Sequence, residues 1–469
     1  DAADKFAPLQ HGMRTANGGE LLYKQIQAQL AENPKQGTLA LDIADAFGSL
    51  DRDQVWNQVC KHFCMPNGAE ESPTSRKGIP VVSLTPATGV SGSSEPQGKR
   101  TVRVPAAPFV QPMLHGATRS VHYGQTHARF YRRTAGIVQG GPWSAFLFCT
   151  AIQSTLEQID ARLKELDPKA LLTAYMDDVM LCIDASKLAQ ALAIATEEFK
   201  KIKLVLNDTK SQAWSPVIGI VINCERVTRP TCMRLSANVT PLLNEGTGQC
   251  TITAEAPEIL QLTDRRAKFL QALTRLQGKG MRMQTTWTLF RAKINGDWNW
   301  WARTTGLPPA VQQKLDSTVM KFLIESFVLN GTTHQLERLH HQLADGGTGI
   351  IRVSDGGPAA LAASWAACYA RVIEACKLDD FTSLQKLLPQ ASAAFNTVQI
   401  ALQASRDTEI PQPVDHTAKI SQKLVMKLVH KKALLAWENA ATSVDKAWRH
   451  SCTGKAGQWL ANPTMPEHI

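Results

Sequence analysis

The chain has 469 residues, which is too long for one compact core and indicates about two or three domains. Lys and Arg number 51 against 41 Asp and Glu, and the resulting net charge of +10 favours a polyanionic partner. No apolar run reaches about 18 residues and no signal-peptide pattern is present, so we expect neither a membrane protein nor a secreted one. The ten cysteines form no disulfide framework, which indicates a reducing compartment.

The first predicted elements surround a single embedded acid. Apolar residues at helical spacing predict a helix over 18–30, and an apolar strand follows over 37–44 with Asp42 near its end. A second helix is predicted over 51–63. Residues 66–104 are rich in Pro, Ser, Gly and Thr, and this composition predicts a disordered insertion, with a recognition loop as the alternative.

The elements after the insertion complete a sheet. They are a hairpin around 128–138, a helix over 144–166, strands over 171–176 and 179–183, a helix over 186–201 and a strand pair over 212–223. The order strand, helix, strand, strand, helix, strand is that of a split β-α-β sheet. It places the strand of Asp42 beside the hairpin that carries Asp177 and Asp178.

Residues from about 259 onward are predicted to be mostly helical. Four tryptophans gather there among Arg and Lys residues: Trp287, Trp298, Trp300 and Trp301. Aromatic and basic residues together suit nucleic-acid contact, but helical tryptophans more often belong to a core, and we expect core positions.

Asp177 and Asp178 interrupt an apolar hairpin with two adjacent charges. Burial of one unpaired carboxylate is so costly that the group neutralises or binds a cation, so the pair suggests Mg²⁺. An ordinary Asp-Asp turn explains the four residues 175–178 equally well when they are taken alone. Neighbouring strands lie about 4.8 Å apart, so Asp42 can share a metal site with the pair.

Phosphoryl transfer to a 3′-hydroxyl uses two divalent ions about 4 Å apart. One ion activates the attacking oxygen, and the other holds the triphosphate and the leaving group. Asp42 and Asp177, on separate strands, are the candidates to bridge both ions.

Five sequence motifs follow one another along the chain, at residues 41–52, 135–148, 175–178, 206–210 and 217–220. Each alone is weak, but the ordered set resembles a reverse transcriptase, specifically the polymerase of non-LTR retrotransposons. The resemblance extends loosely through three later segments, at 289–309, 346–364 and 456–460.

The resemblance implies an α+β fold of the right-hand polymerase type with a split β-α-β palm. Partial fingers and the palm would occupy 1–230, a helical thumb 231–330 and a helical C-terminal extension 331–469. The residues Gln10-His11-Gly12 match a finger segment that basic residues precede in this family, so the chain is expected to be a fragment that starts inside the fingers.

The resemblance also implies roles for the polar residues of the site. Asp42 and Asp177 would ligate the two metal ions with help from the Ile43 carbonyl, and Asp178 would support the site electrostatically. Lys210 would donate a proton to the leaving pyrophosphate, although a lone Lys is usually solvated surface.

Five further residues would contact the substrates. Phe47 would pack under the sugar and exclude a 2′-hydroxyl, while Gln139, Gly140 and Tyr175 would contact the template and the incoming nucleotide. Gly219 would lie in the turn that grips the primer. A plain core Phe and a simple turn at residues 139–142 are the alternatives for the first three.

The expected function is that of an RNA-directed DNA polymerase that extends a DNA primer on an RNA template. It would use dNTPs and two Mg²⁺ ions, which Mn²⁺ could replace, and would act in the nucleus without a membrane. Gly141 and Ala145 stand where the family more commonly has an acidic residue and Pro. The alternatives are a catalytically silent reverse-transcriptase-like relic or domesticated RNA-binding module, and an RNA-templated RNA polymerase, which Phe47 disfavours.

Overall fold

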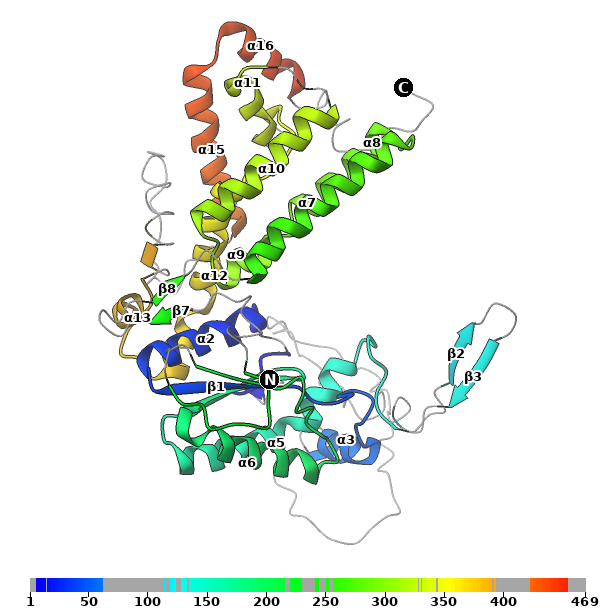
Figure 1. Cartoon of the computed structure of the whole chain (residues 1–469), viewed down its shortest axis with the longest axis vertical. Helices are drawn as coiled ribbons and strands as arrows, with labels where there is room; N and C mark the ends of the chain where they lie inside the picture. The colour runs from blue at the N-terminus through cyan, green and yellow to red at the C-terminus, as the bar shows by residue number, and fades with distance from the viewer. Residues whose placement is uncertain are drawn as a thin grey trace, which may run out of the picture. The chain divides into compact units, whose positions relative to one another are not determined.

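The structure is a computed structural model, and it describes residues 6–13, 15–61, 114, 119–123, 128–132, 135–215, 220–229, 241–243, 250–252, 257–327, 329, 331–342, 345–389, 392–393, 396 and 422–453. The predicted insertion at 66–104 and Gly219 of the predicted primer grip lie outside these residues. The described part combines helices with a small antiparallel sheet (Figure 1), so the expected mixture of helix and sheet is confirmed.

The secondary structure is as follows. The described strands are β1 (Gln36–Leu41), β2 (Arg119–Tyr123), β3 (Ala128–Arg132), β4 (Leu171–Tyr175), β5 (Asp178–Asp184), β6 (Gln212–Trp214), β7 (Pro241–Leu243) and β8 (Cys250–Ile252). The described α-helices are α2 (Gly18–Glu32), α3 (Arg52–Val59), α5 (Ser144–Leu166), α6 (Leu188–Lys201), α7 (Pro257–Gly278), α8 (Met283–Ile294), α9 (Asn299–Thr304), α10 (Pro309–Phe327), α11 (Thr333–Glu337), α12 (Val353–Cys376), α13 (Phe381–Leu387), α15 (Gln422–Ala440) and α16 (Ser443–Cys452).

The chain divides into two compact units. The first comprises Asp1–Ala44, Thr155–Lys201 and Val205–Ile469, and the second comprises Asp45–Ser154 and Ile202–Leu204. The first unit therefore holds the sheet of β1, β4, β5 and β6 and the helices from α6 onward. The second holds α3, the β2–β3 ribbon and the beginning of α5.

The four-stranded sheet has the order β4-β5-β1-β6, and each neighbouring pair is antiparallel. The predicted pairing of the Asp42 strand with the Asp177 hairpin is confirmed, because Leu41 pairs with Val179. Residues 179–183 are all buried, as expected for a continuous apolar run in a central strand.

Helices cover both faces of this sheet. From α2, Leu22, Ile26 and Leu30 pack against Met180 and Cys182 of β5 on one face. Side chains alternate along a strand, so the intervening residues of β5 face the other side. There Figure 1 shows α6, which contacts both β1 and β5.

Two predicted elements differ from the structure. The hairpin expected within 128–138 is wrong, because β3 pairs instead with the earlier strand β2, with Arg119 opposite Arg132. The strand pair expected over 212–223 is also wrong in part. Among the residues of this range that the structure describes, 212–215 and 220–223, only β6 forms a strand, and Gln212 makes an isolated bridge to Thr228. In both cases the strand pairs with a segment outside the residue range that was predicted to form the pair: β3 pairs with β2, and β6 pairs with β1.

The prediction of core positions for the four tryptophans within 287–301 is confirmed only in part: Trp298 is buried, Trp287 and Trp301 are partly buried, and Trp300 is exposed. Trp298 is 1% exposed and packs with Leu262, Leu307 and Leu315, whereas Trp300 is 45% exposed. No helix in the described part of the chain is long and apolar enough to cross a membrane.

A buried polar cluster joins α2 to these helices. The Glu20 carboxylate accepts hydrogen bonds from Arg303 Nε at 2.6 Å and Nη2 at 3.0 Å, and from the Ser364 hydroxyl. Lys24 Nζ donates to the Arg303 carbonyl oxygen at 2.8 Å and lies 4.5 Å from the centre of the Trp365 ring. The cluster places buried charges in contact with partners, as burial of ions requires.

Candidate active site

The β4–β5 hairpin turns through two residues. Tyr175 pairs with Asp178, so Met176 and Asp177 form the turn. The backbone of Met176 is left-handed with φ 57°, as the first position of a tight two-residue hairpin requires. The predicted position of Asp177 and Asp178 at a hairpin tip is confirmed, and Asp178 is exposed at the first position of β5.

Asp42 lies next to this tip because β1 ends there. Leu41 pairs with Val179, and continuing the antiparallel register by one residue places Asp42 opposite Asp178. Side chains of directly opposite residues stand on the same face with Cβ atoms about 5 Å apart. Asp42 and Asp178 are therefore neighbours, as the sequence predicted.

The backbone beyond β1 directs the Ile43 carbonyl toward β5. The Asp42 N–H donates to Ser211 Oγ at 3.0 Å, and the Asp42 carbonyl accepts from Asn207 N at 2.8 Å. Both groups therefore point to the side of β1 away from β5. Successive residues of an extended chain point their backbone groups to alternate sides. Ile43 therefore presents its carbonyl on the side of β5, where the carboxylates lie.

The oxygen donors suit a hard cation, but they do not form a complete cluster. Carboxylates and a backbone carbonyl are the ligands that Mg²⁺ accepts in proteins. In the part of the chain that the structure describes, no group of three or more His, Cys, Asp and Glu side chains could hold a metal ion. The donor chemistry of Asp42, Ile43, Asp177 and Asp178 thus fits Mg²⁺, while the three carboxylates do not converge by themselves.

Lys210 lies beside Asp42. Its Nζ is 3.9 Å from Asp42 Oδ2, and the two side chains are 60% and 27% exposed. The Asn207 side chain accepts hydrogen bonds from the backbone of Thr209 and Lys210, which fixes the turn that carries the lysine. An ion pair this exposed contributes at most about 1 kcal/mol, so the position of the ammonium is not fixed by Asp42.

Phe47 belongs to the second unit, where two of the sequence motifs meet. Its ring stacks on Phe148 with centroids 4.7 Å apart, and it is half-buried. The Phe47 carbonyl accepts from Ile137 N at 2.9 Å, and Leu50 accepts from Gly136 N at 2.9 Å. The structure therefore brings the motif at 41–52 against the start of the motif at 135–148.

Gly136 is essential to this contact, and sequence analysis did not single it out. Its φ is +70°, and a Cβ there would lie 2.3 Å from the Gly48 carbonyl oxygen. Gln139 and Gly140 follow on an exposed loop in the same unit. Gly140 has φ +82°, and a Cβ would meet nothing within 4 Å, so glycine serves the turn and not a close packing contact.

Tyr175 packs at the start of α2. A Cβ on Gly18 would stand 3.2 Å from Tyr175 Cε2, and one on Gly19 would stand 3.9 Å from the same atom. The closest approach at Gly18 is to the His11 carbonyl oxygen, 2.1 Å from such a Cβ, so the ring of Tyr175 is a neighbour of the helix start and not the reason for its glycines. Tyr175 shares the first unit with Asp42, Asp177, Asp178 and Lys210.

The segment Gln10-His11-Gly12 supplies contacts that the sequence did not reveal. His11 N donates to the Ala174 carbonyl and Ala174 N to the Leu9 carbonyl, both at 2.7 Å, which makes a parallel bridge along β4. Burial lowers the pKa of His11 to about 4, so the ring is uncharged at neutral pH. The amide of Gln10 was visible in the sequence, but its partner Met176 is 166 residues away.

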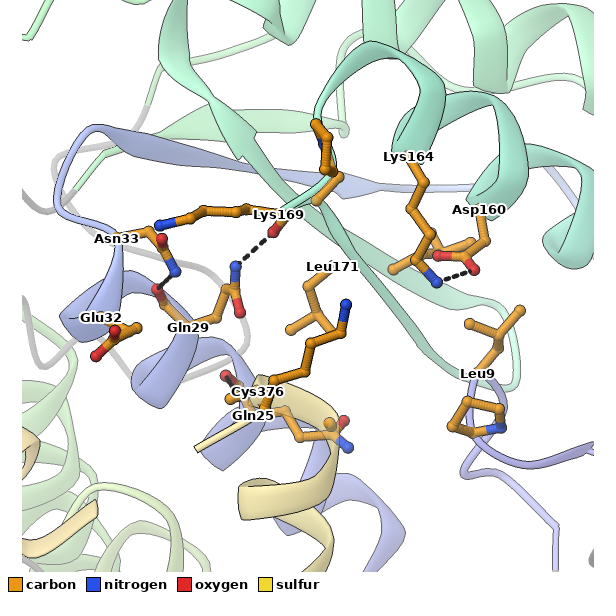
Figure 2. Close-up of a pocket in the computed structure, with 16 residues that line it drawn as sticks. Leu9, Gln25, Gln29, Glu32, Asn33, Asp160, Lys164, Lys169, Leu171 and Cys376 are labelled. Atoms are coloured by element: carbon orange, nitrogen blue, oxygen red, sulfur yellow. Dashed lines mark hydrogen bonds and ion pairs between the residues drawn. The ribbon is translucent and has the colours of Figure 1, made fainter. Parts of the chain in front are cut away.

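A pocket of about 250 Å³ lies elsewhere in the first unit, between α2, β4 and the ends of α5 and α12 (Figure 2). None of the predicted site residues lines it. Its polar groups bond to one another: Gln29 Nε2 donates to the Lys169 carbonyl at 2.7 Å, and Lys164 pairs with Asp160 at 2.5 Å.

Comparison with known families gives a match over part of the chain. Residues 90–270 match the model of the family described as reverse transcriptase (RNA-dependent DNA polymerase). The match agrees with the resemblance to reverse transcriptases that the motifs indicated. The matched segment contains Gln139, Gly140, Tyr175, Asp177, Asp178, Lys210 and Gly219. It begins after Asp42, Ile43 and Phe47.

Comparison with solved structures gives distant similarities. Telomerase from Candida albicans, in a complex with the TWJ fragment of telomeric RNA, is 12% identical with a TM-score of 0.38 and covers 91% of this chain. The corresponding telomerase of Candida tropicalis is 10% identical with a TM-score of 0.35 and covers 79%. The chain spans about half of these proteins, 55% and 51% respectively. No curated protein matches the sequence.

Proposed function

We propose that the chain is the RNA-directed DNA polymerase of a non-LTR retroelement, which extends a DNA primer on an RNA template by two-metal nucleotidyl transfer. The observation that carries the proposal is the carboxylate hairpin, by which we mean the β4–β5 hairpin with Asp177 and Asp178 at its tip. The reverse transcriptase match includes Asp177 and Asp178, and the register of β1 with β5 brings Asp42 opposite Asp178. Acids on adjacent strands are the arrangement that such a transfer needs.

The roles proposed for the site follow from the positions of the donors. Asp42 and Asp177 would hold two Mg²⁺ ions, the Ile43 carbonyl would assist, and Asp178 would add negative charge from its exposed position. When bound, the ions supply Lewis-acid stabilisation of the attacking and leaving oxygens. Lys210, 3.9 Å from Asp42, would protonate the departing pyrophosphate oxygen.

The nucleotide contacts are proposed for the motifs that meet in the second unit. Phe47 would exclude a 2′-hydroxyl, since its stacking on Phe148 fixes the ring plane while leaving the ring partly exposed. Gln139 and Gly140, on their exposed loop, would contact the template and the incoming dNTP together with Tyr175.

We propose the layout of a right-hand polymerase for the whole chain. Partial fingers and a palm would occupy 1–230, a thumb 231–330 and a helical extension 331–469, with Gly219 in the primer grip. A retroelement polymerase acts on chromosomal DNA, so we propose a nuclear location.

A nucleic-acid partner is supported by the charge of α7 and α8. Residues 257–294 contain eight Lys and Arg against two Asp and Glu, a net charge of +6 within a chain of +10. Six of the basic side chains are exposed: Arg265, Lys268, Arg275, Lys279, Arg282 and Lys293. Basic side chains concentrated on one helical hairpin are the electrostatic footprint of phosphate binding.

The second candidate is a catalytically silent module that binds RNA. The observation in its favour is that the described carboxylates do not form a group of three that could hold a metal ion. The basic surface of α7 and α8 would serve such a module equally well. The two candidates differ only in whether nucleotides are incorporated.

Incorporation of labelled dNTPs on a primed RNA with Mg²⁺ tests the proposal. Asp177→Asn should abolish extension, while Asp160→Asn should not, because Asp160 is paired with Lys164 on α5 and lies outside the site. Activity that survives Asp177→Asn contradicts the assigned role. Tight binding of the primed RNA without any incorporation favours the silent module, and extension with NTPs in place of dNTPs contradicts the role of Phe47.

A further inference from the structure

One buried amide holds the tip of the carboxylate hairpin. The Gln10 side chain is 1% exposed, and its Oε1 accepts hydrogen bonds from Met176 N at 2.8 Å and Gly12 N at 2.9 Å. Its Nε2 donates to the Met176 carbonyl oxygen at 3.2 Å. A single side chain therefore satisfies both backbone groups of the residue that precedes Asp177.

Met176 has a backbone conformation that needs such support. Its φ of 57° is left-handed, and a non-glycine residue in this region is strained by an amount on the order of 1 kcal/mol. Strain of this kind persists only where the surroundings hold the backbone in place. The two hydrogen bonds from Gln10 are directed at the strained peptide groups.

The rest of the segment is built to keep Gln10 in position. The parallel bridge to Ala174 fixes the backbone on either side of Gln10. Gly12 lies so close that a Cβ there would be 2.6 Å from Met176 Cγ and 2.7 Å from Met176 N. His11 Nε2 bonds Gln25 Oε1 at 2.9 Å, and Thr173 bonds the same oxygen at 3.0 Å, which ties the segment to α2 and β4.

We propose that Gln10 is a positioning residue that fixes the backbone of Met176 and thereby the aim of the Asp177 carboxylate. Gln10 itself touches no reacting atom, and its effect passes through Met176. The consequence for catalysis rests on the polymerase function proposed above, whereas the consequence for the hairpin does not. A misplacement of a catalytic group by about 1 Å can reduce the rate about 100-fold.

The test replaces Gln10 with Met, which keeps the volume and removes all three hydrogen bonds. Gln29→Met is the matched control, because Gln29 is also a buried amide, donating to Gln36 Oε1 at 2.9 Å and to the Lys169 carbonyl at 2.7 Å, away from the hairpin. Gly12→Ala is a second variant, because its added methyl group would clash with Met176 Cγ and Met176 N. All are made in the full chain.

Three measurements separate positioning from general destabilisation. Hydrogen–deuterium exchange should accelerate in peptides that contain Met176 for Gln10→Met and Gly12→Ala, but not for Gln29→Met. Mn²⁺ affinity, followed by the EPR signal of the free ion, should fall in the same two variants. In primer extension, kcat should fall about 10-fold to 100-fold with KM for dNTP within about threefold, while Gln29→Met retains the wild-type kcat.

The outcomes distinguish the two proposals. Unchanged exchange at Met176 in Gln10→Met overturns the positioning role, whatever the activity. Faster exchange with unchanged Mn²⁺ affinity and unchanged kcat overturns the link to Asp177. If the wild-type chain incorporates no nucleotide, the polymerase proposal fails. The hydrogen–deuterium exchange of Met176 and the Mn²⁺ affinity then still decide whether Gln10 positions the hairpin. Equal losses of Mn²⁺ affinity and of kcat in Gln10→Met and Gln29→Met also overturn the positioning role of Gln10.

Discussion

Lys24 on α2 is a fully buried lysine, and its replacement by Met should change how the free energy of unfolding depends on pH. Burial lowers the pKa of Lys24 from 10.5 to about 8, because the ammonium loses its hydration there. The hydrogen bond to the Arg303 carbonyl and the Trp365 ring only partly replace that hydration. The folded chain thus releases the Lys24 proton at a lower pH than the unfolded chain.

The size and sign of the effect follow from these two pKa values. Below about pH 8, Lys24 carries its proton in both states and contributes no pH dependence. Between pH 8 and 10.5 the unfolded chain keeps a proton that the folded chain has lost, so a rise in pH favours the folded chain. A difference of about 2.5 pKa units at about 1.4 kcal/mol each amounts to about 3 kcal/mol.

Urea unfolding followed by tryptophan fluorescence, from about pH 7 to 10.5, measures this contribution. The free energy of unfolding of the wild-type chain should gain about 3 kcal/mol relative to that of Lys24→Met over this range. Lys268→Met is the control, because the Lys268 side chain is 73% exposed and its replacement should leave the pH profile unchanged. Parallel profiles for the wild type and Lys24→Met would refute the reasoning.

Two further predictions concern stability. Arg303→Met should lower the free energy of unfolding by about 3 to 5 kcal/mol, because the Glu20 carboxylate would stay buried without its bidentate partner. Urea unfolding measures the loss, and adding Glu20→Gln should recover most of it; no recovery would contradict the pairing. Gly136→Ala should cost about 1 to 3 kcal/mol, seen as a lower thermal midpoint, because of its φ of +70° and the Gly48 contact. Gly278→Ala, where a Cβ meets nothing within 4 Å, should be neutral, and equal losses at both glycines would count against the argument.

The parts of the fold that the sequence predicted are those with a local signal. The run Val179–Ile183 is apolar without interruption, and it forms a strand buried on both faces. The acids at 177 and 178 mark the hairpin tip because charges rarely interrupt such a run. The order of elements then placed Asp42 on the neighbouring strand, as the register confirms.

The parts that the sequence did not predict depend on partners far apart along the chain. Gln10 and Met176 are separated by 166 residues, and neither residue type by itself indicates the contact. β3 was assigned to the wrong hairpin, since its partner β2 lies before it and not after it. Nothing in the sequence singled out Gly136, because its φ of +70° and the approach of Gly48 are visible only in the structure.

The buried polar cluster on α2 also bears on the order in which the chain folds. Lys24 and Arg303 are separated by 279 residues, Glu20 and Ser364 by 344, and Gln25 and Cys376 by 351. During synthesis, α2 therefore emerges from the ribosome long before the partners of its polar face. Closing such long loops is slow, and until α12 is made the charged residues of α2 remain in water. Completion of the first unit is thus a late step that requires the chain through residue 376.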